Sequence, residues 1–246
     1  MINTEMPTPK GQDQVASRDL PSLDLQRAHL RTLAGRGVHV ASGRGEPCQL
    51  LITFTALLSA PLILIWLAPA NRSLWWVLPL AVLVVDFLSG VVHWLFDTRV
   101  QPGTSLLGRA AVNFLDHHVH PRRSAEVGFA ATTWRVAMYL SLPLMVTALL
   151  LPADWTQAWL FWLGALSLVV AQTHKEAHKQ RPLVFVRVLQ RCHLSLPPYA
   201  HQRHHRHHEQ AYCVFTGWWN PLLDEIGFWR KLERALERRA GGAGAG

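Results

Sequence analysis

Residues 74–96 read LWWVLPLAVLVVDFLSGVVHWLF, and this stretch decides the fold class. A helix needs about 20 mostly apolar residues to cross roughly 30 Å of hydrocarbon, and this stretch meets that length. It nevertheless carries Asp86 and His93. An aspartate within a spanning helix costs about 2.5–3.5 kcal/mol on insertion scales, so it is expected only where it has a partner or a function. The sequence therefore predicts a membrane helix with a polar face turned toward the protein interior.

Three further stretches approach the length of a membrane helix, namely residues 50–68, 136–151 and 155–173. Short turns at residues 69–73 and 152–154 divide the four stretches into two tight antiparallel hairpins. Half of the 246 residues are hydrophobic and 11 are tryptophan, a composition that favours a membrane protein. We therefore predict an all-α integral membrane protein with four transmembrane helices.

The distribution of positive charge predicts the orientation of this bundle. The two hairpin turns carry only Arg72 and Asp154, whereas the other loops and the two terminal regions carry nearly all the lysine and arginine. Positive loops stay on the cytoplasmic side, so both termini and the 97–133 region are expected there, in a bacterial inner membrane. The net charge of +8 follows from this topology and from anionic head groups, so no nucleic acid is predicted as a partner.

Composition divides the chain into three parts. Residues 1–47 lack an apolar core and are predicted to be a disordered cytoplasmic leader, residues 48–239 the membrane domain, and residues 240–246 a flexible tail. Two basic amphipathic stretches, 183–190 and 222–236, are expected to form helices that either lie in the membrane interface or pack on the cytoplasmic side. The three cysteines are too scattered for a disulfide framework.

Eight of the 14 histidines form four groups on the predicted cytoplasmic side: His93; His117 and His118; His174 and His178; and His201, His204 and His205. Residues four apart share a helix face, whereas adjacent residues diverge by about 100°, which suits ligands of two different ions. Imidazole binds iron, zinc, copper and nickel alike. Eight imidazoles exceed the four ligands of a tetrahedral zinc, so the count predicts two metal ions with open positions.

Carboxylates accompany these histidines. Asp86, Gly90, His93 and Asp97 follow a four, three, four spacing and form one stripe that is expected to face the bundle interior. Asp86 is predicted to hydrogen-bond the free ring nitrogen of a ligand histidine, and the same role is open to Asp97 and Asp116. The alternative for Asp86 is a hydrogen bond between helices without any role at a metal.

Several motifs resemble the lipid desaturase family, which includes plasmanylethanolamine desaturases, their bacterial members and a plastid phosphatidylglycerol desaturase. The resemblance covers residues 80–230 and rests on DFLSGVVHW at 86–94, HHxxP at 117–121, QTHKxxH at 172–178, HxxHH at 201–205, and the YC and GWWN motifs at 212–213 and 217–220. The number and order of these motifs make the resemblance specific.

The resemblance implies an oxidoreductase with two iron ions, which uses O2 and two electrons from a cytochrome b5-like or ferredoxin-like protein. The substrate it implies is an ether phospholipid, converted to the vinyl ether of a plasmalogen. The eight grouped histidines match the family's histidines. His208 and Glu209 resemble a further His-Glu pair at a shorter spacing, and His120 stands where ether-lipid members have an acidic residue, so none of these three is assigned. Candidates for the lipid phosphate are Arg122, Arg123 and Lys175, whose alternative role is to set topology.

Other functions use similar residues. An acyl-lipid desaturase of the phosphatidylglycerol type or a di-iron hydroxylase would use the same centre on a different bond. A histidine-rich metal transporter or sensor is the non-enzymatic alternative, but transport needs polar residues across the membrane, whereas only Asp86 lies deep. A zinc protease is disfavoured because residues 174–178 and 208–212 do not form HExxH.

Overall fold

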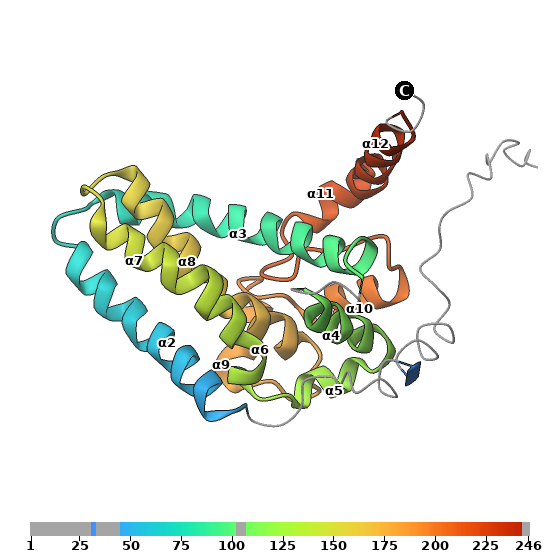
Figure 1. Ribbon diagram of the computed structural model, residues 1–246, viewed down its shortest axis with the longest axis horizontal. Helices are drawn as coiled ribbons and strands as arrows, with labels where there is room; N and C mark the ends of the chain where they lie inside the picture. Colours follow the sequence, from blue (N-terminus) through green and yellow to red (C-terminus); the bar gives the residue numbers. More distant parts are fainter. Residues whose placement is uncertain (1–30, 33–44, 102–106, 243–246) are drawn as a thin grey trace, which may run out of the picture.

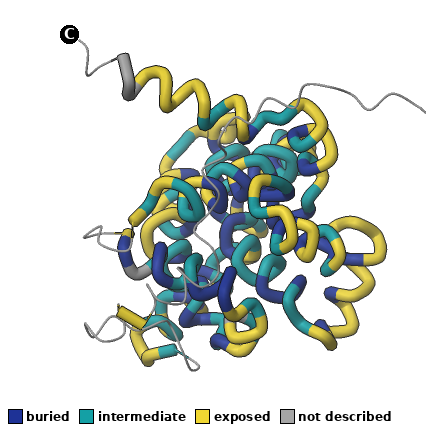
Figure 2. The backbone as a smooth tube through the Cα atoms, turned by 90° about the vertical axis from the view of Figure 1, so that its right-hand side faces the viewer, coloured by how far each residue is buried: buried dark blue, intermediate teal, exposed yellow. Residues whose placement is uncertain are grey.

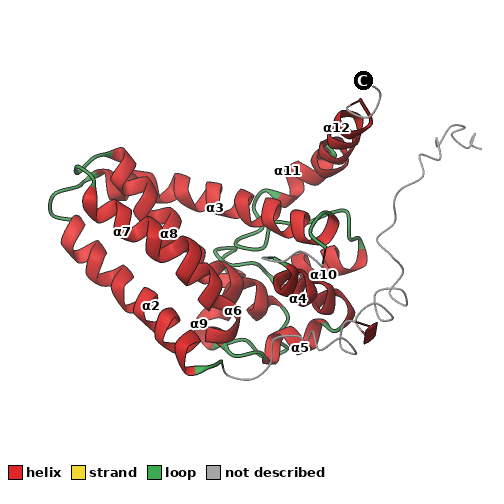
Figure 3. Cartoon of the chain, viewed as in Figure 1, coloured by secondary structure: helices red, strands yellow, loops and turns green. Residues whose placement is uncertain are grey.

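The computed structural model describes residues 31–32, 45–101 and 107–242, and within these residues it contains helices and no strands (Figure 3). The elements are α2 (Pro47–Leu67), α3 (Ser73–Thr98), α4 (Gly108–Val119), α5 (Pro121–Glu126), α6 (Phe129–Val136), a π-helical turn η1 (Ala137–Ser141), α7 (Leu142–Leu150), α8 (Trp155–Ala177), α9 (Val184–Arg191), α10 (Pro198–Arg206), α11 (Asn220–Glu225) and α12 (Phe228–Gly242).

The long helices α2, α3, α7 and α8 run side by side, and both hairpin turns lie at one end of this bundle (Figure 1). The short helices α4, α5 and α10 gather at the opposite end. Three helical stretches are long and apolar enough to cross a membrane: Pro47–Leu67, Ser73–Thr98 and Phe129–Leu150. The predicted fourth stretch forms α8, which has the required length but is not among these three.

Helix α8 is less apolar because it lies inside the bundle, packed on α3 and α7, where its polar side chains find partners. Gln157 donates to the carbonyls of Ala148 and Leu151 (3.1 and 2.9 Å), and Ser167 pairs with Ser141 at 2.9 Å. Buried side-chain hydrogen bonds of this kind join helices in a membrane bundle. The outer surface is different, since α2 turns Leu58, Trp66 and other large apolar side chains outward, and exposed positions follow the outside of the molecule in Figure 2.

The observed boundaries differ from the expected ones in the middle and at the end of the chain. The region 97–133 was expected to be a loop but holds α4 and α5, and the third long stretch begins at Phe129 instead of residue 136. The amphipathic stretch 222–236 is two helices because the chain turns at Gly227, whose φ is +63°. Helix α12 continues to Gly242, into the predicted tail, and nearly all of the predicted leader falls outside the described residues.

Candidate metal centre

The half of α3 nearer the short helices carries the predicted stripe, and the side chains of Asp86, His93 and Asp97 are all buried. Gly90 is the position where the segment after α10 packs on α3, because a Cβ there would lie 2.6 Å from Cys213 Sγ. A larger residue at position 90 would push this segment away from the helix. The stripe therefore holds the 211–219 segment against α3 at the same level as the histidines.

Asp86 secures this segment and does not contact a histidine. Its carboxylate accepts hydrogen bonds from the backbone amides of Thr216 (2.8 Å), Gly217 (2.9 Å) and Trp219 (3.3 Å). Asp86 was predicted to bond a ligand ring, but the hydrogen bonds that its carboxylate accepts in the structure come from these backbone amides. The free-energy cost of burying the Asp86 charge is offset by these charge-assisted hydrogen bonds, which fix a chain segment against α3. This role resembles the alternative in which Asp86 forms structural hydrogen bonds and has no role at a metal.

The first histidine group combines side chains from α4, α8 and α10. The Nε2 atom of His201 lies 2.9 Å from that of His174, 2.8 Å from that of His178 and 3.1 Å from that of His205. The Nε2 atom of His117 lies 3.2 Å from that of His174. One nitrogen of His201 thus meets three others, and a ring nitrogen carrying at most one proton cannot satisfy all of these contacts as hydrogen bonds.

The second group lies beside the first and joins α3, α4 and α10. Asp97 places its two carboxylate oxygens 3.4 Å from His93 Nε2, 3.0 Å from His118 Nε2 and 3.4 Å from His204 Nε2. Asp97 was expected to bond the far nitrogen of a ligand ring, but its oxygens lie among the nitrogens that point inward. The carboxylate is therefore a candidate ligand in its own right.

The contacts around the second group have the signature of a cation site. The Nε2 atoms of His93, His118 and His204 and both oxygens of Asp97 are buried, and although the nitrogens lie 3.0–3.4 Å from the oxygens, none of these atoms forms a hydrogen bond of good geometry. Buried polar groups without partners are costly, so five such atoms in one place require an explanation. Ligand atoms around an ion at about 2.1 Å lie about 3.0–3.4 Å apart in octahedral or tetrahedral geometry. The observed separations in both groups fit such coordination. In each set of four residues, one ligand atom from each residue lies within 4.8 Å of the ligand atoms of the other three.

Adjacent residues on α4 serve different groups. His117 belongs to the set with His174, His178 and His201, and His118 belongs to the set with His93, Asp97 and His204. The divergence of about 100° between neighbours on a helix produces this division. Helix α10 also contributes to both sets, through His201 and His204, so α4 and α10 hold the two candidate sites together.

Two backbone carbonyls orient rings of the second group. The chain turns sharply at Ala211, where φ is +56°. On either side of this turn, the carbonyl of Gln210 lies 2.7 Å from His204 Nδ1 and that of Tyr212 lies 3.2 Å from His93 Nδ1. A Nδ1–H bonded to a carbonyl leaves Nε2 unprotonated and directed at the metal position. Sequence patterns did not reveal this role, because every residue has a backbone carbonyl and residue type does not show which carbonyl bonds a histidine ring.

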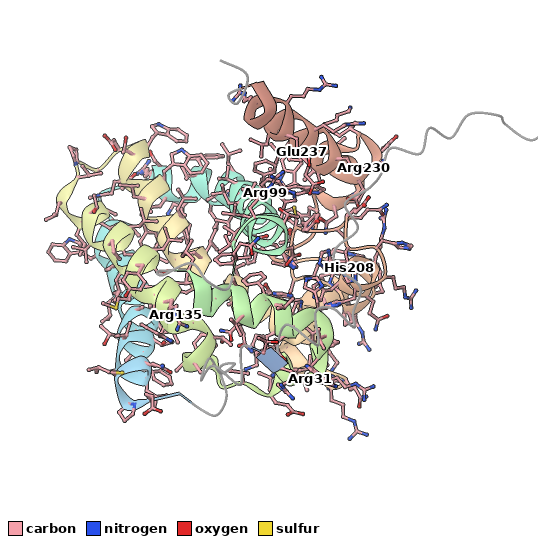
Figure 4. All side chains as sticks on the ribbon, turned by 45° about the vertical axis from the view of Figure 1, so that its right-hand side comes forward. Arg31, Arg99, Arg135, His208, Arg230 and Glu237 are labelled. Carbon is pink, nitrogen blue, oxygen red and sulfur yellow. The ribbon has the colours of Figure 1, made fainter. Side chains whose placement is uncertain are left out.

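The remaining candidate ligands lie at the edge of the two ligand sets or outside them. His205 contacts His201, and His208 Nδ1 lies 3.1 Å from His118 Nδ1, behind the ring that faces Asp97. Figure 4 shows His208 on this side of the protein. His120 is 44% exposed and pairs with Asp116, and Glu209 is exposed. Neither His120 nor Glu209 reaches either group.

Asp116 also departs from its predicted role as a partner of a ligand ring. Its oxygen Oδ1 accepts from Arg123 at 3.1 Å and lies 2.8 Å from His120 Nδ1. Residues 116 and 117 diverge on α4, so the Asp116 carboxylate is turned away from the His117 ring and toward the following turn. Its contacts stabilise the junction between α4 and α5.

Burial keeps the histidines of the site in the form that binds metal. Desolvation, reinforced by the neighbouring rings, lowers the pKa of His117 and of His201 well below the usual value, and lowers the pKa of His178 to about 4. Desolvation and the nearby His118 likewise lower the pKa of His205. At pH 7 these rings are neutral, so their nitrogen lone pairs are available to a metal ion.

Comparison with known proteins gives one consistent result. Residues 82–244 match the lipid desaturase domain. The plasmanylethanolamine desaturase of Myxococcus xanthus is 34% identical over 198 residues, covering 76% of this chain and 69% of the relative. Plasmanylethanolamine desaturase 1 of mouse is 34% identical over 172 residues, covering 65% and 63%. The chloroplastic fatty acid desaturase 4 of Arabidopsis thaliana is 28% identical over 156 residues, covering 61% and 48%. No solved structure matches the chain.

Proposed function

Because this chain belongs to the lipid desaturase family, an oxidoreductase family of the membrane, we propose that it is a plasmanylethanolamine desaturase that forms the vinyl ether bond of plasmalogens. The observation that carries this proposal is the pair of adjoining ligand sets, because family membership implies oxidative chemistry and the sets offer room for the metals that such chemistry needs. Imidazole and carboxylate ligands together suit iron, and two iron ions are the proposed cofactor.

The reaction removes two hydrogens from neighbouring carbons of the alkyl chain, beginning at the carbon bonded to the ether oxygen. O2 takes up these two hydrogens together with two electrons and two protons, giving two molecules of water. No side-chain acid or base can remove hydrogen from an unactivated methylene, so the bound irons supply the oxidising chemistry. The electrons are proposed to come from a cytochrome b5-like or ferredoxin-like protein.

The protein residues have distinct tasks in this proposal. His117, His174, His178 and His201 hold one iron, and the second is held by His93, Asp97, His118 and His204. The carbonyls of residues 210 and 212 keep two rings in the ligating tautomer. His205 stands beside His201 at the first set.

The proposed topology has four membrane crossings, with α8 as the fourth, and both termini in the cytoplasm of a bacterial cell. Support comes from the arrangement of the bundle, since both hairpin turns lie at one end and the histidine-bearing short helices at the other (Figure 1). The few charges at the turns fit the outer side. In this orientation both ligand sets face the side on which reduced electron carriers are available.

Lipid mass spectrometry with detection of acid-labile vinyl ethers tests the proposal. Cells supplied with an alkyl ether phospholipid are expected to form plasmalogen when they express this chain, and to form none when they express His178→Ala, which removes a ligand of the first set. His120→Ala is the matched control and is expected to retain activity, because its exposed ring lies outside both sets. Plasmalogen formation by His178→Ala would contradict the assignment, and a new acyl double bond instead of a vinyl ether would identify an acyl-lipid desaturase.

A further inference from the structure

A cavity of about 720 Å³ opens beside the first ligand set. Its wall comes from α5, the end of α8, α9 and the start of α10, and it includes His178. Sites for small molecules commonly have volumes of about 300–1,000 Å³. Through His178, the cavity therefore adjoins the proposed metal centre.

The cavity is strongly cationic. Arg122, Arg187 and Arg191 line it, and none of them pairs with a carboxylate anywhere in the described parts of the chain. A fourth cation, Lys179, is already paired with the buried Glu176. Aspartate and glutamate are absent from the described residues of the wall. Three unpaired guanidinium groups around one hollow favour an anion, and their fork geometry suits phosphate in particular.

Helix α9 indicates where this cavity lies relative to the membrane. Its Arg187 and Arg191 are four residues apart and border the cavity, whereas Val184, Phe185 and Val188 are 70%, 63% and 51% exposed. A short helix with exposed apolar side chains beside basic ones is typical of a helix lying in the membrane interface. The cavity thus opens at the level of lipid head groups.

The proposed reaction adds a constraint on distance. In a glycerophospholipid with an alkyl ether, six bonds separate the phosphorus atom from the first carbon of the alkyl chain. Six bonds in an extended chain span about 7 Å, since three backbone bonds of a polypeptide span about 3.3–3.6 Å. The phosphate must therefore be held close to the metals when the hydrogens are removed. A phosphate site far from the histidines would not satisfy this requirement.

Resting on the proposed function, we propose that this cavity binds the phosphate of the substrate phospholipid through Arg187 and Arg191, with Arg122 of α5 as a third cation of the wall. His178 both lines this cavity and belongs to the first ligand set, so a phosphate bound here would lie beside the metal centre. Two other predicted phosphate ligands are engaged elsewhere: Arg123 with Asp116, and Lys175 with the carbonyl of Val127. The site recognises the phosphate and offers no carboxylate for the amine of the head group.

Calorimetric titration of the purified, iron-loaded full chain tests this site without requiring turnover. The probes are inorganic phosphate, dihexyl glycerophosphoethanolamine and dihexylglycerol, which lacks the phosphate. The double variant Arg187→Gln, Arg191→Gln is expected to bind the phospholipid at least about tenfold more weakly, since it loses charge-assisted hydrogen bonds. Binding of dihexylglycerol is expected to be the same in both proteins. In nanodiscs, the half-saturating fraction of ether lipid should rise.

Two further variants make the result specific. Arg230→Gln removes an exposed arginine of α12 (Figure 4). Arg230 is not among the residues that line the cavity, so this variant is expected to bind like the unchanged protein. The double variant Arg187→Lys, Arg191→Lys should recover part of the affinity, since lysine keeps the charge without the planar guanidinium fork. Unchanged phospholipid binding by the glutamine variant would overturn the proposal, and so would inorganic phosphate binding as tightly as the phospholipid, which would indicate a site for free phosphate. A chain that binds the phospholipid at these arginines but forms no vinyl ether would contradict the proposed function and leave this site in place.

Discussion

Replacing His201 with alanine is expected to abolish vinyl ether formation and to reduce the iron content of the purified protein. The His201 Nε2 atom lies within 3.1 Å of three other ring nitrogens, so it stands at the centre of the first ligand set. Loss of partners that only orient ligands already costs about 10–100-fold in metal affinity or activity, so loss of this ligand should cost at least about 100-fold. Iron analysis and an in vitro desaturation assay measure the two effects.

His207→Ala is the matched control for this variant. His207 follows α10 directly and is exposed, and it belongs to neither ligand set. It should retain iron and activity, which separates loss of a ligand from a general effect of removing histidine here. If His201→Ala kept both irons and its activity, the first set would not be a metal site.

The second large effect is expected at Asp97. The Asp97→Asn variant keeps the shape of the side chain but removes its charge and one acceptor oxygen facing three histidine nitrogens. If the carboxylate is a ligand, the purified variant should hold about one iron instead of two, and activity should fall at least about 100-fold. Metal analysis decides the matter independently of activity.

Asp116→Asn provides the comparison, because the Asp116 side chain is buried like that of Asp97 but contacts His120 and Arg123 outside the ligand sets. This variant should keep both irons. A result in which Asp97→Asn also keeps two irons, with only a modest loss of activity, would assign Asp97 the orienting role that the sequence suggested. The iron count thus distinguishes a ligand from a residue that holds one.

Residue type and spacing were sufficient for the family and for the helical membrane character. The four apolar stretches all form helices, and the histidines that the spacing grouped together come from four separate helices to one end of the bundle. The separation of His117 from His118 follows from helix geometry alone. These features are local or periodic, and periodicity survives folding because the α-helix fixes the direction of each side chain.

The carboxylates were not predictable in the same way. Asp86 and Asp97 lie on one face of α3, yet one binds backbone amides at residues 216–219 and the other faces three histidines. The difference depends on which distant segment packs against each turn of the helix, and that contact is set by Gly90 and Cys213 far apart in sequence. Spacing along α3 places both carboxylates inward but cannot specify their partners. The carbonyls that orient His93 and His204 could not be predicted either, because they belong to the same distant segment.

A single turnover of the purified protein tests the central claim most directly. The protein is loaded with iron, reduced without oxygen in nanodiscs that contain an alkyl ether phospholipid, and then exposed to O2. Two ferrous ions supply the two electrons of one reaction, so we predict about one vinyl ether for each chain that holds two irons, and none in the iron-free protein. Full loading with two reduced irons and no vinyl ether, or vinyl ether formation without iron, would contradict the account.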